Sequence, residues 1–287
     1  MRVQVTNDDG IDSEGLQVLA RHLAEAGHEV IVVAPDRDWS GAGACLGVIA
    51  PRQPLAVSRV ELPEAPSVEA WALEGPPALT VIAARLGAFG PPPELVVSGI
   101  NAGLNTGRSI LHSGTVGAVL TAQNFGLSGL AVSVADSNPW HWDTAAGLAV
   151  EILDMLIDAP PRSTLNLNVP ARPRNEVQGV RWGRIAPFGA VRASVAAAGV
   201  DQVQFELVAT DYEAPDDTDQ GIVDAGSASL TTIVGVTEAW APRDEDETVD
   251  LERLVERMVP GAPLHHAHRI PDGSAPHVLH RPLLVEG

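Results

Sequence analysis

Apolar positions along the first 170 residues follow two periods, one typical of buried strands and one typical of amphipathic helices. The short apolar, β-branched runs predict strands at residues 3–6, 29–34, 54–60, 68–73, 94–98, 129–135 and 164–169. The helical spacing predicts helices at residues 13–27, 77–87, 114–125 and 144–157. Strands that alternate with helices in this way predict a parallel sheet covered on both faces.

From about residue 175 onward the pattern is less regular. Further strands are expected at residues 177–186, 203–209 and 229–236, with long polar loops between them. Residues 250–259, DLERLVERMV, have the spacing of a short amphipathic helix. We therefore predict an α/β protein with a Rossmann-like three-layer fold, a mostly parallel sheet and a C-terminal β-hairpin or arm. Residues 1–175 form the catalytic core in this prediction, and residues 176–287 add sheet elements, the oligomerisation arm and a C-terminal helix and tail.

Composition excludes membrane-spanning and disordered classes. The chain has 287 residues, of which 45% are apolar, and no apolar run approaches the roughly 20 residues that span a bilayer. A single cysteine, Cys45, cannot form an internal disulfide and fits a reducing compartment. Because the first residues do not resemble a signal peptide, we expect a cytoplasmic protein without a membrane partner.

Charge narrows the possible ligands. The chain carries 37 acidic and 18 basic residues, a net charge of −19, which disfavours binding to a nucleic-acid duplex. Residues 211–254 hold 13 acidic and 2 basic side chains, which is typical of a solvated face or arm. Every basic residue is arginine, and the absence of lysine excludes a Walker-type phosphate loop and Schiff-base chemistry. Phosphate, if bound, must be held by backbone amides, hydroxyls, arginine or a metal.

Two adjacent aspartates, Asp8 and Asp9, follow the first predicted strand in the segment VTNDDGID. They fall in a strand-to-helix loop, which in open α/β sheets lies at the carboxyl edge where ligands bind. Two neighbouring carboxylates repel each other unless a cation or shared protons neutralise them. On this segment alone, a helix-capping aspartate beside a solvated one is an equally ordinary interpretation.

Two further loops place polar side chains at the same predicted edge. DRDWSGAG offers Ser40 among glycines, and SGINAGLNTGRSILHSGTVG offers Asn101, Asn105, Ser113 and Thr115. Oxygen ligands without paired histidines or cysteines suit Mg²⁺, Mn²⁺ or Ca²⁺. SGTVG begins a predicted helix, and the free amides of a helix start favour a phosphate group.

Taken together, these segments resemble the SurE family, the stationary-phase survival proteins that act as metal-dependent nucleotidases. The segments that match are VTNDDGID, GHEVIVVAPDRDWSGAG, ELVVSGINAGLNTG, HSGTVGA and LNLNVP. The resemblance is strong over about residues 1–170 and then thins to TDQGIVDAGSASLT, which is similar to a region near the family's subunit contacts.

The resemblance implies a phosphomonoesterase that hydrolyses nucleoside 5′- and 3′-monophosphates, with one divalent metal ion per subunit. The implied metal ligands are Asp8, Asp9, Ser40 and Asn101. The implied phosphate contacts are Asn105, Ser113, Gly114 and Thr115. Either aspartate is a candidate to orient or deprotonate the attacking water. The family also implies a homodimer or homotetramer, which we expect to exchange the C-terminal arm.

Two departures from the family pattern leave substrate choice open. Trp39 precedes Ser40 and is either a packed aromatic or a stacking platform for a base. His112 occupies the position where the family commonly has tyrosine. Its imidazole either contacts the substrate or forms a hydrogen bond with a backbone partner in its loop. The competing functions are a specialised phosphatase for a biosynthetic phosphate ester and a nucleotide-binding module without turnover.

Overall fold

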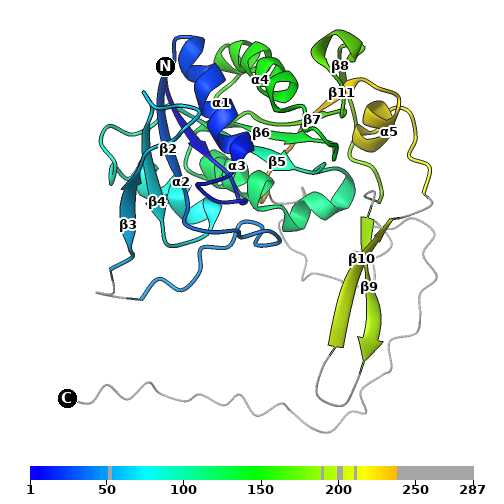
Figure 1. Ribbon diagram of the computed structural model, residues 1–287, viewed down its shortest axis with the longest axis horizontal. Coiled ribbons are helices and arrows are strands. Elements are labelled where there is room, and N and C mark those ends of the chain that lie inside the picture. Colours follow the sequence, from blue (N-terminus) through cyan, green and yellow to red (C-terminus); the bar gives the residue numbers. More distant parts are fainter. Residues whose placement is uncertain (51–53, 189–190, 199–202, 210–211, 238–287) are drawn as a thin grey trace, which may run out of the picture. The chain divides into compact units, whose positions relative to one another are not determined.

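The computed structural model describes residues 1–50, 54–188, 191–198, 203–209 and 212–237 (Figure 1). The main sheet contains nine strands in the order β3-β4-β2-β1-β5-β6-β7-β11-β8. Their bounds are β1 Arg2–Thr6, β2 Glu29–Pro35, β3 Val57–Val60, β4 Glu69–Leu73, β5 Leu95–Ala102, β6 Ser128–Val134, β7 Thr164–Val169, β8 Val180–Trp182 and β11 Ala228–Thr232. The helices are α1 Glu14–Glu25, α2 Pro77–Arg85, α3 Gly114–Asn124, α4 Trp142–Ile157 and α5 Asp219–Asp224, with 3-10 turns η1 Gly107–His112 and η2 Arg174–Glu176.

The six central strands, from β4 to β7, are parallel. Antiparallel pairing occurs only toward the edges of this sheet, between β3 and β4 and between β7 and β11. The mostly parallel sheet predicted from the alternating pattern is therefore confirmed.

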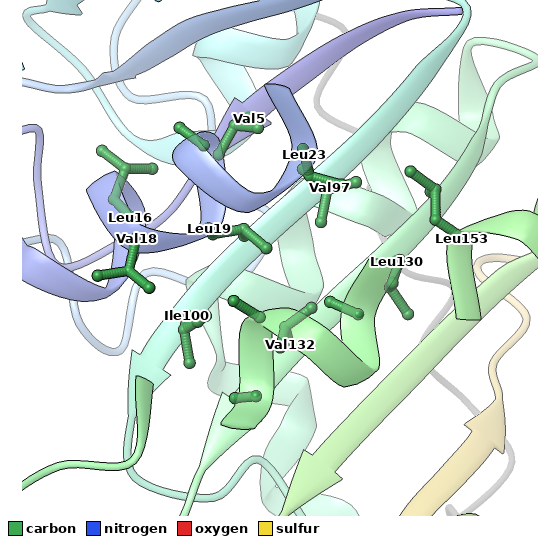
Figure 2. Close-up of a cluster of buried hydrophobic side chains, with 14 of the residues drawn as sticks. Val5, Leu16, Val18, Leu19, Leu23, Val97, Ile100, Leu130, Val132 and Leu153 are labelled. Carbon is green, nitrogen blue, oxygen red and sulfur yellow. The ribbon is translucent and has the colours of Figure 1, made fainter. Parts of the chain in front are cut away.

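Helices cover both faces of the sheet, which gives the three predicted layers. On one face, Leu16, Leu19 and Leu23 of α1 pack with side chains of β1, β5, β6 and α4 in the main core cluster (Figure 2). On the other face, Val81 of α2 and Ala118 of α3 pack in a separate buried cluster. Burial of Leu, Ile and Val side chains on both faces explains why the central strands are almost continuously apolar.

The chain order creates a topological switch point at β1. The chain passes from β1 to β2 on one side, and later returns to place β5 on the other side of β1. In open α/β sheets, ligands bind beyond the carboxyl ends of the strands at such a point. The loop after β1 carries Asp8 and Asp9, and the end of β5 carries Asn101, so the fold presents these side chains at the expected edge.

Several predicted elements differ from those observed. β5 extends past Ser98 to Ala102, with a register irregularity between Ser98 and Asn101 that lets the strand continue into the site. The expected strand at residues 177–186 is only the three residues of β8. α5 and β9 (Val191–Ala198) were not expected from the pattern. The helix predicted at residues 250–259 lies outside the described residues.

A separate two-stranded sheet pairs β9 antiparallel with β10 (Val203–Ala209). This hairpin is the described part of the predicted arm. Its exchange between subunits and the domain boundary at residue 175 stay predictions. Within the described ranges, no helix combines the length and the apolar character needed to cross a bilayer.

Candidate active site

The loop after β1 is shaped by Asn7 and Gly10. The Asn7 side-chain amide donates to the Gly10 carbonyl at 3.0 Å and to Ser13 Oγ at 2.9 Å, and Asn7 Oδ1 accepts from the Gly10 amide at 3.2 Å. Gly10 has a φ of +97°, which only glycine adopts readily. Ser13 then caps α1, and its side chain accepts from the Leu16 amide. The turn fixes Asp8 and Asp9 at the end of β1.

The Asp8 carboxylate is buried against the start of α3. Its Oδ2 accepts a hydrogen bond from the Gly114 amide at 3.0 Å, and its Oδ1 accepts one from the Thr115 hydroxyl at 2.5 Å. A Cβ at position 114 would lie 2.6 Å from Asp8 Cβ, so this approach requires glycine. The amides that the sequence assigned to a phosphate group therefore donate to a protein carboxylate in this structure.

Burial raises the pKa of both aspartates. For Asp8 the loss of hydration outweighs the hydrogen bonds from Thr115 and Gly114, which lower its pKa. For Asp9, burial first and then the Asp8 charge raise the pKa to about 6. Asp38 adds a smaller repulsion. Burial and two neighbouring carboxylates therefore disfavour the charged form of Asp9, and a cation beside it would stabilise that form.

The second loop meets the first through its backbone. The Trp39 amide donates to the Asp8 carbonyl at 2.7 Å. Ser40 is exposed, and both its amide and its hydroxyl donate to Asp38 Oδ1, at 2.7 and 2.6 Å. Asp38, which the sequence analysis did not single out, therefore orients the predicted ligand Ser40.

Asn101 reaches the same cluster from the end of β5. Its Oδ1 lies 3.3 Å from Thr115 Oγ1, and its side-chain amide donates to the Gly103 carbonyl at 2.7 Å. This arrangement turns the amide oxygen toward the aspartate side of the loop. Among the described residues, no group of three His, Cys, Asp or Glu side chains is arranged to hold a metal ion. A metal here would need the neutral oxygens of Ser40 and Asn101 beside the two carboxylates, which fits the predicted ligand set and a hard cation.

The Asn105 loop is held from β7. The Asn105 carbonyl accepts hydrogen bonds from the side-chain amides of Asn166 and Asn168, each at 2.9 Å. The Asn105 amide donates to Asn168 Oδ1 at 2.8 Å, and its side chain donates to Ser133 Oγ at 2.9 Å. The polar residues of the LNLNVP segment, which lie fully buried in a strand, thus fix a predicted phosphate contact.

The third loop ends at the helix cap. Ser113 is the N-cap of α3, and its hydroxyl oxygen accepts from the Val116 amide at 3.2 Å. His112 is exposed, and its carbonyl accepts from the Gly43 amide at 3.0 Å, which joins this loop to the second. The three loops predicted to share one sheet edge are therefore in mutual contact.

Trp39 is half-buried, and the guanidinium of Arg37 lies 4.8 Å from the centre of its ring. This distance is typical of a cation–π contact. Arg37 thus covers part of the Trp39 ring. The stacking role of Trp39 and the substrate contact by His112 stay predictions.

One sequence interpretation is wrong in part. Asp219 belongs to the acidic region 211–254, for which a solvated face or arm was expected, yet it is fully buried. Its carboxylate accepts three backbone hydrogen bonds, from Gly107, Ala186 and Gln220. Only the TDQG segment could have indicated this, because charge counting does not distinguish a buried aspartate from a surface one.

Comparison with known proteins gives the family. The family model for survival protein SurE matches residues 3–189. A 5'-nucleotidase SurE from Thermosynechococcus vestitus is 42% identical over 183 residues, which cover 63% of this chain and 68% of that protein. One from Stenotrophomonas maltophilia is 42% identical over 189 residues, covering 64% and 70%. The crystal structure of the SurE protein from Aquifex aeolicus matches with a TM-score of 0.67 and 27% identity, over 82% of this chain and 93% of that one.

Proposed function

Because this chain belongs to the SurE family, we propose that it is a metal-dependent phosphomonoesterase that releases phosphate from nucleoside 5′-monophosphates, and also from 3′-monophosphates. The observation that carries the proposal is the pair Asp8 and Asp9 at the switch point, the first buried and the second half-buried, both with raised pKa values. Aspartates that only support the fold are not stabilised by lying next to each other, whereas a cation site requires concentrated negative charge.

We assign the metal to Asp8, Asp9, Ser40 and Asn101, with one ion per subunit and Mg²⁺, Mn²⁺ or Ca²⁺ as the candidates. When bound, such an ion supplies Lewis-acid polarisation of a phosphoryl oxygen and makes a bound water more acidic. Asp38 would hold Ser40 in place, since it accepts hydrogen bonds from both the amide and the hydroxyl of that residue.

The remaining groups would bind phosphate and move the proton. The Ser113 hydroxyl accepts from Val116, which leaves its hydrogen to donate to a phosphoryl oxygen. Asn105 is held in position by β7, and Gly114 and Thr115 hold Asp8. Both oxygens of Asp8 already accept hydrogen bonds, which favours Asp9 as the group that orients or deprotonates the attacking water.

The direct test is phosphate release from AMP, CMP, 3′-AMP and an aryl phosphate, each with Mn²⁺, with Mg²⁺ and with EDTA. We expect release that depends on the metal and is abolished by EDTA. Tight nucleotide binding without metal-dependent release would instead support the binding module. Release from the aryl phosphate alone would support a specialised phosphatase, since the retained phosphate site would then lack a nucleoside site.

The assembly is also a proposal. We propose a homodimer or homotetramer in which the β9–β10 hairpin is exchanged between subunits. Light scattering at micromolar concentration measures the subunit number directly, and a monomer there would refute the exchange.

A further inference from the structure

Asp219 lies far from the proposed metal ligands in sequence but is bonded to the loop that carries Asn105. Its side chain is fully buried at the start of α5. Oδ2 accepts a hydrogen bond from the Gly107 amide at 2.9 Å, while Oδ1 accepts from the amides of Ala186 at 2.9 Å and Gln220 at 2.8 Å. One carboxylate therefore joins two separate backbone segments.

A neighbouring contact strengthens the same connection. The Thr106 hydroxyl, also buried, donates to Gln220 Oε1 at 2.5 Å. α5 thus holds residues 106 and 107 from one side, while Asn166 and Asn168 of β7 hold Asn105 from the other. Gly107 begins η1, which ends at His112, directly before Ser113. A shift at residue 107 would pass to Asn105 and Ser113, two of the proposed phosphate contacts.

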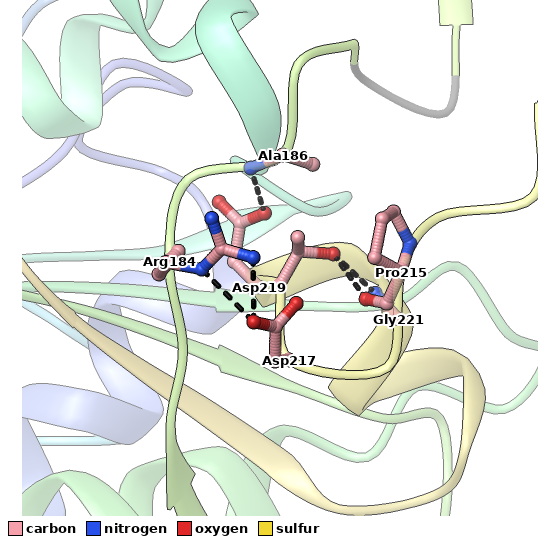
Figure 3. A network of polar contacts seen from close by, with 7 residues as sticks. Arg184, Ala186, Pro215, Asp217, Asp219 and Gly221 are labelled. Carbon is pink, nitrogen blue, oxygen red and sulfur yellow. Dashed lines mark hydrogen bonds and ion pairs between the residues drawn. The ribbon is translucent and has the colours of Figure 1, made fainter.

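The second segment bonded to Asp219 contains Arg184 and Ala186 and precedes β9 in the chain; we call this segment the base of the hairpin. Figure 3 shows the hydrogen bond from Ala186 to Asp219 and, beside it, the ion pair of Arg184 with Asp217. The backbones of Arg184 and residues 217–219 also pair, because the Arg184 amide donates to the Asp217 carbonyl and the Asp219 amide to the Arg184 carbonyl. Asp219 therefore joins this base to the phosphate loop.

We propose that Asp219 is a positioning residue for phosphate binding, which fixes the Asn105–Gly107 loop and ties it to the base of the hairpin. This inference rests on the proposed function. Asp219 touches neither the reacting atoms nor the metal ligands; it acts through the Gly107 amide. Its loss should weaken phosphate binding and leave the metal site unchanged.

The substitution Asp219→Asn isolates this role. An asparagine keeps the shape, and its single carbonyl oxygen can still accept from Ala186 and Gln220, as Oδ1 does now. Its NH₂ group then faces the Gly107 amide, which places two donors against each other. The substitution therefore removes only the hydrogen bond from the Gly107 amide, which belongs to the phosphate loop. The matched control is Asp217→Asn, which removes a carboxylate two residues away whose partner, Arg184, is exposed.

We expect Asp219→Asn to raise the KM for AMP and the inhibition constant of inorganic phosphate by roughly tenfold, since small displacements of binding groups are costly. The Mn²⁺ concentration for half-maximal activity should stay within about twofold, and Asp217→Asn should match the wild type. Unchanged KM and phosphate inhibition in Asp219→Asn, with only a lower melting temperature, would overturn the proposal.

Two further measurements separate this inference from its premise. Amide hydrogen exchange over residues 105–112 should be faster in Asp219→Asn than in Asp217→Asn, whether or not the protein turns over nucleotides. Thr106→Val, which removes the other tie without adding volume, should raise the KM in the same direction even if Asp219→Asn does not fold. If the wild type is inactive, the proposed function fails, while equal exchange rates would refute the positioning role by itself.

Discussion

Gly117, in the first turns of α3, allows the loop that carries Ser40 to pack against the helix. A Cβ at this position would lie 2.3 Å from the Gly43 carbonyl oxygen and 2.7 Å from the Ala44 amide nitrogen. Both neighbours are backbone atoms, so the loop or the helix would have to move. The substitution Gly117→Ala tests whether this contact holds the second loop in place.

A matched control removes the intrinsic effect of the substitution. Gly147 lies within α4, and a Cβ there would meet no atom within 4 Å. Gly147→Ala should therefore stabilise the protein by about 0.5–1 kcal/mol, because alanine favours the helix. Gly117→Ala should have the same favourable helix propensity, but overpacking should lower its free energy of unfolding by about 1–3 kcal/mol. The free energies of unfolding of the two variants should thus differ by about 1–3 kcal/mol, which corresponds to a gap of roughly 2–12 °C in melting temperature.

Thermal denaturation of the two variants, with metal titration of their phosphatase activity, measures both consequences. Gly117→Ala should require more Mn²⁺ for half-maximal activity, because displacement of Gly43 moves Ser40, whereas Gly147→Ala should match the wild type. Equal stabilisation by the two substitutions, with an unchanged metal requirement, would refute the reasoning.

Three other predictions concern the site and the surface. Asp9→Asn should abolish metal-dependent phosphate release, because it removes a charged metal ligand, while circular dichroism should show an unchanged fold. Full activity of this variant at the Mn²⁺ concentration used for the wild type would contradict the assignment. Trp39→Ala should lower kcat/KM for AMP about tenfold, since stacking contributes about 1–3 kcal/mol per base, whereas kcat/KM for a small aryl phosphate should hardly change. Equal losses on both substrates would mean that Trp39 only supports its loop. Hydrogen bonds from His22, and to a smaller extent from Arg21, lower the pKa of Asp143 below its ordinary value of 3.8. The ionised carboxylate therefore stabilises the fold above pH 3.8, and this stabilisation is lost as the pH falls through the lowered pKa. Because the Asp143 side chain is 74% exposed, Asp143→Asn should cost only about 0.2–1 kcal/mol at pH 7 in urea unfolding. The difference should shrink as the pH falls below 3.8, and a difference that stays constant would contradict this cause.

The sequence predicted the core of the fold because its strands and helices have unambiguous periods. The runs ending in Thr6, Ala34 and Ser98 are apolar and β-branched, and each is followed by polar and glycine residues. This pattern located the three loops and, through the carboxyl-edge rule, their convergence. The observed caps, Ser13 and Ser113, are residues that commonly begin helices, which is why the starts of α1 and α3 were located closely.

The supporting contacts could not be predicted in the same way. Asn166 and Asn168 have strand spacing, but the sequence does not state that they bond to Asn105, which lies 61 and 63 residues away. Asp38 is one of several aspartates in a polar loop, and its bond to Ser40 depends on the local turn. α5 has only six residues, too few for a helical period to be recognised. Long-range polar contacts carry no local signal.

The spacing of these contacts along the chain bears on how the protein acquires activity. The bond from Gly114 to Asp8 spans 106 residues, and that from Gly107 to Asp219 spans 112. Neither can form until distant parts of the chain have been brought together, and contacts of such separation slow folding. A ribosome must therefore release the chain beyond Asp219 before the phosphate loop can acquire its final shape. Complete catalytic competence is thus a late event in synthesis, because a truncated product that ends after β7 would bury much of the core but lack the α5 contacts to residues 106 and 107 of the phosphate loop.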